Sequence, residues 1–586
     1  MKKIRHIAAL LTLIVVGVST TYAQQDITKS IEVTKAYVPT VNGATKLIVR
    51  PRMDDTVRLQ PEIDYSIKPV ACYTTFSSRP ISPAQVNATP YRTNNPGYVA
   101  IAFGFQPRTQ FDLYLNNREN SERVLGGYIN HRGSYSRRRS DLDTLQNAIS
   151  LYNAVGFFGS QRWGKMTLRG DVGYDNRVLH RFGSFTNPAF WTGSPATEDT
   201  IALLPTAKES LVDYGRAHGN IYFGHDFANL STLNFGVGMD AGFTHDIRGT
   251  QMADINIDGR VAKMFGMHGF DAAVEYNSYY GIARLSERGA QSFVLRPRYL
   301  MRYEDVRLGV GVDYGYRTSR GFESVGKSYV FPHVDFSIDP LSGYLIPYIK
   351  ATGDFIDGSF ESLSRANPYI AAGVTAPTGA KIEAEAGFTG NALQSISYGL
   401  YFNYTHFDNM YHFVSLYKPM GSQFADSFGV IIDNAERYSV GASAEYIYAG
   451  VLSTALSAHY YCYHTEHLAR KSNGGGTPSY DVALDVKYRH KKKFTIEASA
   501  KLIGARKFYE MAGATSTTMM AEDVAGSVVL NRVPACVDVN VTLNLHINKG
   551  WWLFVNGTNL ADSKLYTFNH YRSLGAGVMI GFKSAF

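Results

Sequence analysis

The chain has 586 residues and a formal net charge of +8, and it contains 54 glycines, 40 tyrosines, 33 phenylalanines and 3 cysteines. The three cysteines lie far apart in the sequence, at Cys72, Cys462 and Cys536. Their odd number and wide spacing exclude a disulfide framework and a cysteine metal site, although one disulfide could form. The basic charge is spread along the chain, so we expect contact with anionic lipid and lipopolysaccharide and no nucleic-acid partner.

Residues 1–23 have the features of a secretory signal peptide. Lys2 and Lys3 give a basic start, Ile7–Val18 is mostly apolar, and the small residue Ala23 precedes the predicted cleavage site. A membrane anchor is the alternative, but the apolar run is shorter than the roughly 20 residues that a spanning helix needs. We therefore expect cleavage after Ala23.

Residues 24–97 form a second segment, which is rich in proline and also carries aromatic residues. Proline disfavours helices and central strands, so we expect an extended segment in the periplasm or in a barrel lumen. Disordered linkers are poor in aromatic residues, which makes a passive linker the weaker alternative. The prolines are at positions 39, 51, 61, 69, 80, 83, 90 and 96, and the aromatic residues are Tyr37, Tyr65, Tyr73, Phe76 and Tyr91.

From about Tyr98 to the C-terminus, apolar residues alternate with polar or glycine residues. Between Leu233 and Phe243 every odd position is apolar and every even position is Asn, Gly or Asp. Such alternation places the two sets on opposite faces of a strand. The runs cover about 9–13 residues, which matches the roughly 9–11 residues of a tilted membrane strand. Similar runs occupy 308–316 and 537–547.

The connections between these runs alternate between short and long. Residues 480–488 and 494–502 predict a hairpin around a polar turn. Short periplasmic turns and long outer loops are typical of outer-membrane barrels. The predicted outer loops are Ser136–Asn147, Phe182–Asp213, Ala283–Gln291, Asp354–Ala366, Thr465–Ser479 and Tyr509–Arg532.

The chain end also fits an outer-membrane barrel. Leu574, Ala576, Val578, Ile580, Phe582 and Phe586 occupy even positions, and Phe586 is the last residue. We therefore predict an all-β fold for residues 98–586, a large antiparallel transmembrane barrel of about 22 strands. A barrel of this size has a lumen too wide for side chains to fill.

The sequence 556–560, Asn-Gly-Thr-Asn-Leu, followed by Tyr566 and a final strand ending in Phe586, resembles the closing region of TonB-dependent receptors. The resemblance covers about the last 490 residues at the level of pattern. It implies a receptor-like barrel in the outer membrane. Residues 24–97 are too short for the plug domain of that family and show no recognisable plug motif or TonB box.

No catalytic, cofactor-binding or metal-binding residues are predicted. The cluster His464-Thr465-Glu466-His467 lacks the HExxH arrangement, and no nucleophile elbow, P-loop or dinucleotide fingerprint follows a strand. The acidic pairs Asp54-Asp55 and Asp141/Asp143 have no histidine partner in the sequence. Two functions remain: solute passage or uptake, and a non-transporting scaffold or assembly-complex subunit with periplasmic or surface partners. The fold does not choose between them.

Overall fold

The computed structural model describes residues 96–117, 122–139, 145–183, 210–322, 326–417, 427–468, 475–491, 493–512, 516–548 and 550–586. The predicted signal peptide and nearly all of the predicted N-terminal segment lie outside these residues. Gly97, at the end of that segment, already belongs to the first strand. Cys462 and Cys536 are free thiols. No helix within the described ranges is long and apolar enough to cross a membrane.

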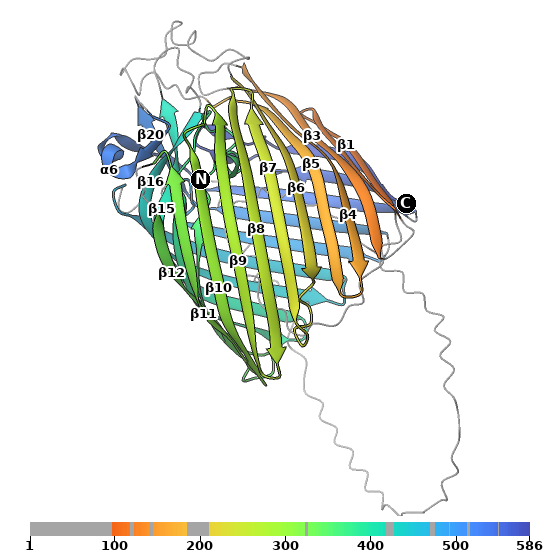
Figure 1. The fold of residues 1–586 in the computed structure, drawn as a ribbon. Helices are drawn as coiled ribbons and strands as arrows, with labels where there is room; N and C mark the ends of the chain where they lie inside the picture. Colours follow the sequence, from red (N-terminus) through yellow and green to blue (C-terminus); the bar gives the residue numbers. More distant parts are fainter. Residues whose placement is uncertain are drawn as a thin grey trace, which may run out of the picture. The chain divides into compact units, whose positions relative to one another are not determined.

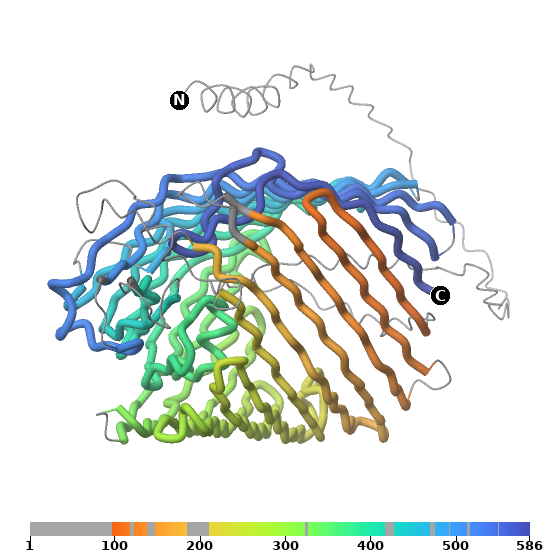
Figure 2. The backbone as a smooth tube through the Cα atoms, turned by 90° about the horizontal axis from the view of Figure 1, so that it is seen from above, coloured from red at the N-terminus to blue at the C-terminus, as the bar shows by residue number. Residues whose placement is uncertain are grey.

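The strands form a closed antiparallel barrel of 22 strands, as predicted. Each strand pairs with its neighbours in order, and the ring closes where β1 pairs with β27 (Figure 2). The strands of the ring are β1 (Gly97–Gly104), β2 (Arg108–Asn116), β3 (Arg123–Arg139), β4 (Leu145–Trp163), β5 (Met166–His180), β6 (Leu211–His225), β7 (Asn234–Asp246), β8 (Thr250–Phe265), β9 (His268–Ala283), β10 (Gly289–Tyr303), β11 (Val306–Arg320), β12 (Lys327–Ile338), β13 (Ile346–Ile356), β14 (Gly379–Leu393), β15 (Ile396–Tyr417), β16 (Ser427–Tyr448), β17 (Leu452–Thr465), β18 (Tyr480–His490), β19 (Phe494–Ile503), β23 (Cys536–Asn548), β24 (Trp551–Thr558) and β27 (Gly577–Ala585).

The two ends of the barrel differ in the length of their connections. Tight turns such as Gly164-Lys165 and Gly266-Met267 lie at one end, together with the start of β1 and the end of β27. The long connections lie at the other end, at the top of Figure 1. Because outer-membrane barrels keep short turns in the periplasm, the end with the long connections is the outer end.

The two faces of the wall follow the alternation of the sequence. In β7 the side chains of Phe235, Val237 and Met239 are exposed on the outside, whereas Asn234 is buried on the inside. An apolar outer surface of paired strands is what lipid requires, because every backbone group in the bilayer must find a partner within the protein. The chain is therefore an outer-membrane barrel, as predicted. The predicted hairpin is also confirmed, since β18 pairs with β19.

Three further strands lie outside the ring, at the outer end. They are β20 (Arg506–Ala512), β21 (Thr518–Met520) and β22 (Val528–Val533), and the short helices α6 (Ala521–Val524) and η1 (Ala525–Ser527) connect β21 to β22. Strand β20 runs parallel to the outer end of β15 (Figure 1). It pairs with β22, while β21 runs parallel to β16. The predicted outer loop Tyr509–Arg532 lies in the outer connection between β19 and β23, but it contains strands, because the extended ends of β15 and β16 offer free edges to which this segment pairs.

Several predicted boundaries also need correction. The predicted outer loop Ser136–Asn147 is shorter, because β3 ends at Arg139 and β4 begins at Leu145. Strand β27 begins at Gly577, so Leu574 and Ala576 precede it and do not share its outer face. Strand β13 runs to Ile356 and β14 begins at Gly379, so the connection predicted as Asp354–Ala366 starts later and ends later. The short helix α5 (Phe360–Ala366) lies near the start of this connection.

Candidate functional site

The inner face of the wall is crossed by ion pairs between neighbouring strands. Arg296 of β10 is the centre of one group: its guanidinium lies 3.0 Å from Asp354, 3.2 Å from Glu275 and 3.3 Å from the fully buried Asp313. A buried charge is tolerated only when it is paired and hydrogen-bonded. A second group joins Arg317 and Lys327 to Asp408. Within the described residues the lumen is therefore lined by charged and polar groups.

The connection between β13 and β14, residues 357–378, is named here the cap loop. It begins with a capped turn: Asp357 accepts hydrogen bonds from Ser359, and the Ser359 hydroxyl accepts one from the Ser362 N–H at 3.2 Å, which starts α5. Burial raises the pKa of Asp357. The cap fixes the direction of α5, which therefore leaves the wall in a defined orientation.

The cap loop packs like the core of a soluble protein. Phe360 and Leu363 of α5 are fully buried, although they belong to a connection between two wall strands. They pack in one cluster with Tyr214, Met252 and Tyr279 from the inner wall. Burial of a large apolar side chain contributes about 1.5–3 kcal/mol. The other buried members of the cluster in the cap loop are Ile370, Ala371, Val374 and Ala376.

Hydrogen bonds tie the cap loop to two distant parts of the ring. On one side Arg181, just after β5, donates to the Ile370 carbonyl at 2.7 Å, and Tyr214 of β6 donates to the Pro368 carbonyl at 3.0 Å. On the other side the Ala371 N–H donates to the carbonyl of Phe428 in β16 at 2.8 Å. Strands β6 and β16 are ten steps apart in a ring of 22, so they lie on nearly opposite walls. The cap loop therefore crosses the outer mouth.

A second element, the closing hairpin, meets the cap loop there. It consists of β25 (Tyr566–Phe568) and β26 (Tyr571–Arg572), and it belongs to the connection between β24 and β27. The ring of Tyr571 stacks on that of Tyr369 in the cap loop with 3.7 Å between centroids. Phe182 contacts both tyrosines edge-on. Aromatic contacts of this kind add about 0.5–1.5 kcal/mol beyond the buried area.

A buried polar network holds the closing hairpin against β20. Asn569 is fully buried and donates to Ser415 at 2.9 Å and to Glu510 at 2.6 Å, and His570 lies 2.9 Å from the same carboxylate. Burial alone would raise the pKa of Glu510, but the hydrogen bonds from His570 and Asn569 outweigh it, and the pKa lies below its ordinary value. The network therefore favours an ionised Glu510.

The sequence motif at 556–560 has a structural role in this region. Residues 556–558 end β24, and Asn559 follows in the left-handed conformation with φ of 47°. Its buried side chain accepts from the Ser563 N–H at 3.0 Å and donates to the Leu574 carbonyl at 3.1 Å. Asparagine suits this position because it tolerates the conformation and bonds to the backbone. Asn559 thus shapes the base of the connection that carries the closing hairpin.

The cluster at 464–467 divides into two environments. His464 contacts Tyr438 edge-on, whereas His467 joins Asp433 and Glu466, whose donor atoms lie within 4.8 Å of one another. Both carboxylate oxygens of Asp433 already accept hydrogen bonds from the backbone N–H groups of His467 and Leu468. Asp433 therefore holds the turn that follows β17. The acidic pairs at 54–55 and 141–143 lie outside the described residues.

No protein-family model matches the chain, and no curated protein matches it by sequence. Solved structures match the fold. The FrpB iron transporter from Neisseria meningitidis aligns with a TM-score of 0.62 at 8% identity, over 84% of this chain and 81% of that one. The ferric enterobactin receptor PfeA from Pseudomonas aeruginosa gives 0.59 at 10%, over 84% and 80%. FpvA from the same species, bound to pyoverdines, gives 0.56 at 11%, over 84% and 71%.

At this level of identity the comparisons show the fold alone. The chain has a TonB-dependent-receptor-like barrel, in agreement with the resemblance of its closing region. The sequence did not predict that the cap loop packs across the outer mouth. One signal was present: Phe360 and Leu363 are apolar residues three positions apart, outside any alternating run, in a connection expected to be polar.

Proposed function

We propose that this barrel is a receptor-like channel for uptake of a small polar solute, with the cap loop as its outer constriction. The observation that carries the proposal is the cap loop itself, which crosses the mouth of a lumen lined by charged groups. A charged lining offers partners to a hydrated solute, whereas a crossing loop limits the size of what enters. The structural neighbours include an iron transporter and a ferric enterobactin receptor, which is consistent with uptake.

The test is ion conductance of the purified full-length chain in planar bilayers, compared with a cap-loop variant. In Phe360→Ala/Leu363→Ala the two fully buried side chains of α5 are removed, so the cap loop should loosen while the wall stays paired. We expect larger or longer-lived openings in the variant and faster swelling of liposomes in a sugar solution. Phe265→Ala, on the exposed outer surface, serves as the control. Identical, closed behaviour of all three proteins would contradict the proposal.

A scaffold or assembly subunit is the second candidate. The additional strands β20–β22 lie beyond the ring, where Met520 and Val529 present exposed apolar side chains. Exposed apolar groups of this kind suit a protein partner at the cell surface. This candidate would be favoured over uptake by two results together. A partner protein co-purifies with the wild type but not with Val529→Glu, and the purified barrel shows no ion conductance in planar bilayers. Neither candidate requires a catalytic step.

A further inference from the structure

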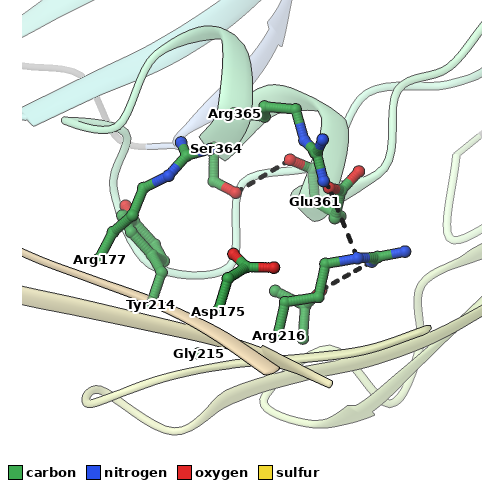
Figure 3. A pocket seen from close by; sticks show the side chains of 9 residues that line it. Asp175, Arg177, Tyr214, Gly215, Arg216, Glu361, Ser364 and Arg365 are labelled. Atoms are coloured by element: carbon green, nitrogen blue, oxygen red, sulfur yellow. Dashed lines mark hydrogen bonds and ion pairs between the residues drawn. The ribbon is translucent and has the colours of Figure 1, made fainter. Parts of the chain in front are cut away.

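A pocket lies between the cap loop and the inner wall. Asp175 and Arg177 of β5, Tyr214 and Arg216 of β6 and Thr244 of β7 form its floor, and Glu361, Ser364 and Arg365 of α5 form its roof. In Figure 3 the carboxylate of Asp175 points into the space between the wall and the helix, and Arg177 rises beside it. The site thus combines both signs of charge beneath the constriction.

Two of the three arginines in the pocket are already neutralised. Arg216 donates twice to Asp254, at 2.7 and 2.8 Å, and lies 3.8 Å from Glu361. Arg365 donates to Glu361 at 2.8 Å through its Nε and also through Nη2. The Arg365–Glu361 pair lies within α5, and the contact between Arg216 and Glu361 joins the helix to the wall. Both arginines are therefore neutralised by the protein and leave little positive charge for a ligand.

Arg177 is different. Among the described residues it makes no hydrogen bond and no ion pair. Its register partners on the same inner face are Tyr214 of β6 and Tyr152 of β4, and the next residue across, in β3, is Arg132. Arg132 also has no hydrogen-bonded or ionic partner in the described part of the chain. Opposite residues on neighbouring strands are about 5 Å apart, so two uncompensated guanidinium groups flank Tyr152.

Asp175 provides the opposite charge close by. It precedes Arg177 by one inward position of β5, and its carboxylate lies 3.5 Å from the His218 imidazole. Asp175, Arg177 and Arg365 line the pocket together, and Arg132 lies two strands from Arg177 on the same inner face. A planar guanidinium matches a carboxylate in two-point contact, and a carboxylate such as Asp175 pairs with an ammonium.

We propose that this pocket binds a small zwitterionic solute, of the class of amino acids and short peptides. The solute carboxylate is held by Arg177 and Arg132, and its ammonium is held by Asp175. The inference rests on the proposed uptake function, because it names the class of solute that passes the cap loop. Binding would use the charges of Arg177, Arg132 and Asp175. The ion pairs Arg216–Asp254 and Arg365–Glu361 would stay intact.

The experiment is isothermal titration of the detergent-purified full-length barrel with alanyl-alanine as the probe and acetate as the simple anion. We expect Arg177→Gln to weaken dipeptide binding about tenfold or more, because a charge-assisted contact is lost. Asp175→Asn should weaken dipeptide binding and leave acetate binding unchanged or stronger. Arg169→Gln is the matched control: it lies on the same face of β5 but stacks on Tyr222 at 4.6 Å, away from the pocket. Heat-modifiable migration on gels verifies that each variant is folded.

Three results would overturn the inference: absence of dipeptide binding to the wild-type barrel, equal binding by wild type and Arg177→Gln, or acetate binding as tightly as the dipeptide. The last result would make the pocket a site for simple anions. Bilayer conductance separates this inference from the proposed function. If the barrel conducts but Arg177→Gln binds the dipeptide as well as the wild type does, the binding site is contradicted and the uptake function is not. If the barrel does not conduct but binds the dipeptide in a way that depends on Arg177, the uptake function is contradicted and the binding site is not.

Discussion

The barrel wall and the outer cap, which consists of the cap loop and the closing hairpin, are stabilised in different ways. In the wall each strand pairs with the next strand along the chain, and apolar residues such as Val237 face outward. In the outer cap Phe360 and Tyr571 are buried among residues from distant parts of the chain. The wall depends on lipid and backbone hydrogen bonds, whereas the outer cap depends on side-chain packing. Mutations should therefore damage one without the other.

The largest effect is expected from the core of the cap loop. Phe360→Ala removes a fully buried ring and should cost about 3–5 kcal/mol of local stability. The cap loop should become sensitive to protease added from outside, while heat-modifiable migration of the barrel is retained. Loss of the folded barrel itself would show that the outer cap and the wall are one cooperative unit and would break the comparison.

The wall should respond to charge on one face only. Val237→Arg faces lipid and should cost about 2–4 kcal/mol near the bilayer midplane. Gly238→Arg faces the lumen, where its side chain would meet the flexible carboxylate of Asp258 and can pair with it. Urea unfolding of the two variants in liposomes measures the difference. Equal damage from both, or the reverse order, would contradict the assignment of the faces.

The polar network beneath the closing hairpin should give a smaller effect. Asn569→Ala removes the buried hydrogen bonds that Asn569 donates to Glu510 and Ser415, which costs about 1–3 kcal/mol. We expect faster hydrogen exchange in residues 566–572 with no change in the wall. Asn229→Ala, in an exposed turn at the opposite end, is the control and should leave exchange in the hairpin unaltered.

The smallest effect is expected from acid. Because the pKa of Glu510 is lowered in the folded state, its contribution to stability is fully present above the ordinary value of 4.5 and is lost as the pH falls through the lowered pKa. Exchange in the closing hairpin should therefore rise below about pH 4.5. In Glu510→Gln this acid-dependent step should disappear. A step of the same size in both proteins would assign it to another group.

Most of the barrel wall could be predicted from the sequence, whereas the outer cap could not. The number of strands, the face of each residue in β7 and the hairpin of β18 and β19 follow from alternation and turn residues, because the direction of a strand side chain depends only on its neighbours in sequence. The boundaries of β13 and β14 were missed because residues 357–378 mix apolar and polar residues without a strand period. The additional strands β20–β22 were missed because the edges that they pair with are created by the extended ends of β15 and β16.

By itself, the sequence determined that this chain forms a 22-stranded outer-membrane barrel with an apolar exterior and a polar lumen. Only the tertiary structure decided that the outer mouth is crossed and that a charged pocket lies beneath the crossing. The contacts that decide this join Tyr369 to Tyr571 and Arg216 to Glu361, residues separated by more than a hundred positions. Local pattern carries no information about such pairs, because closure of the ring is what brings them together.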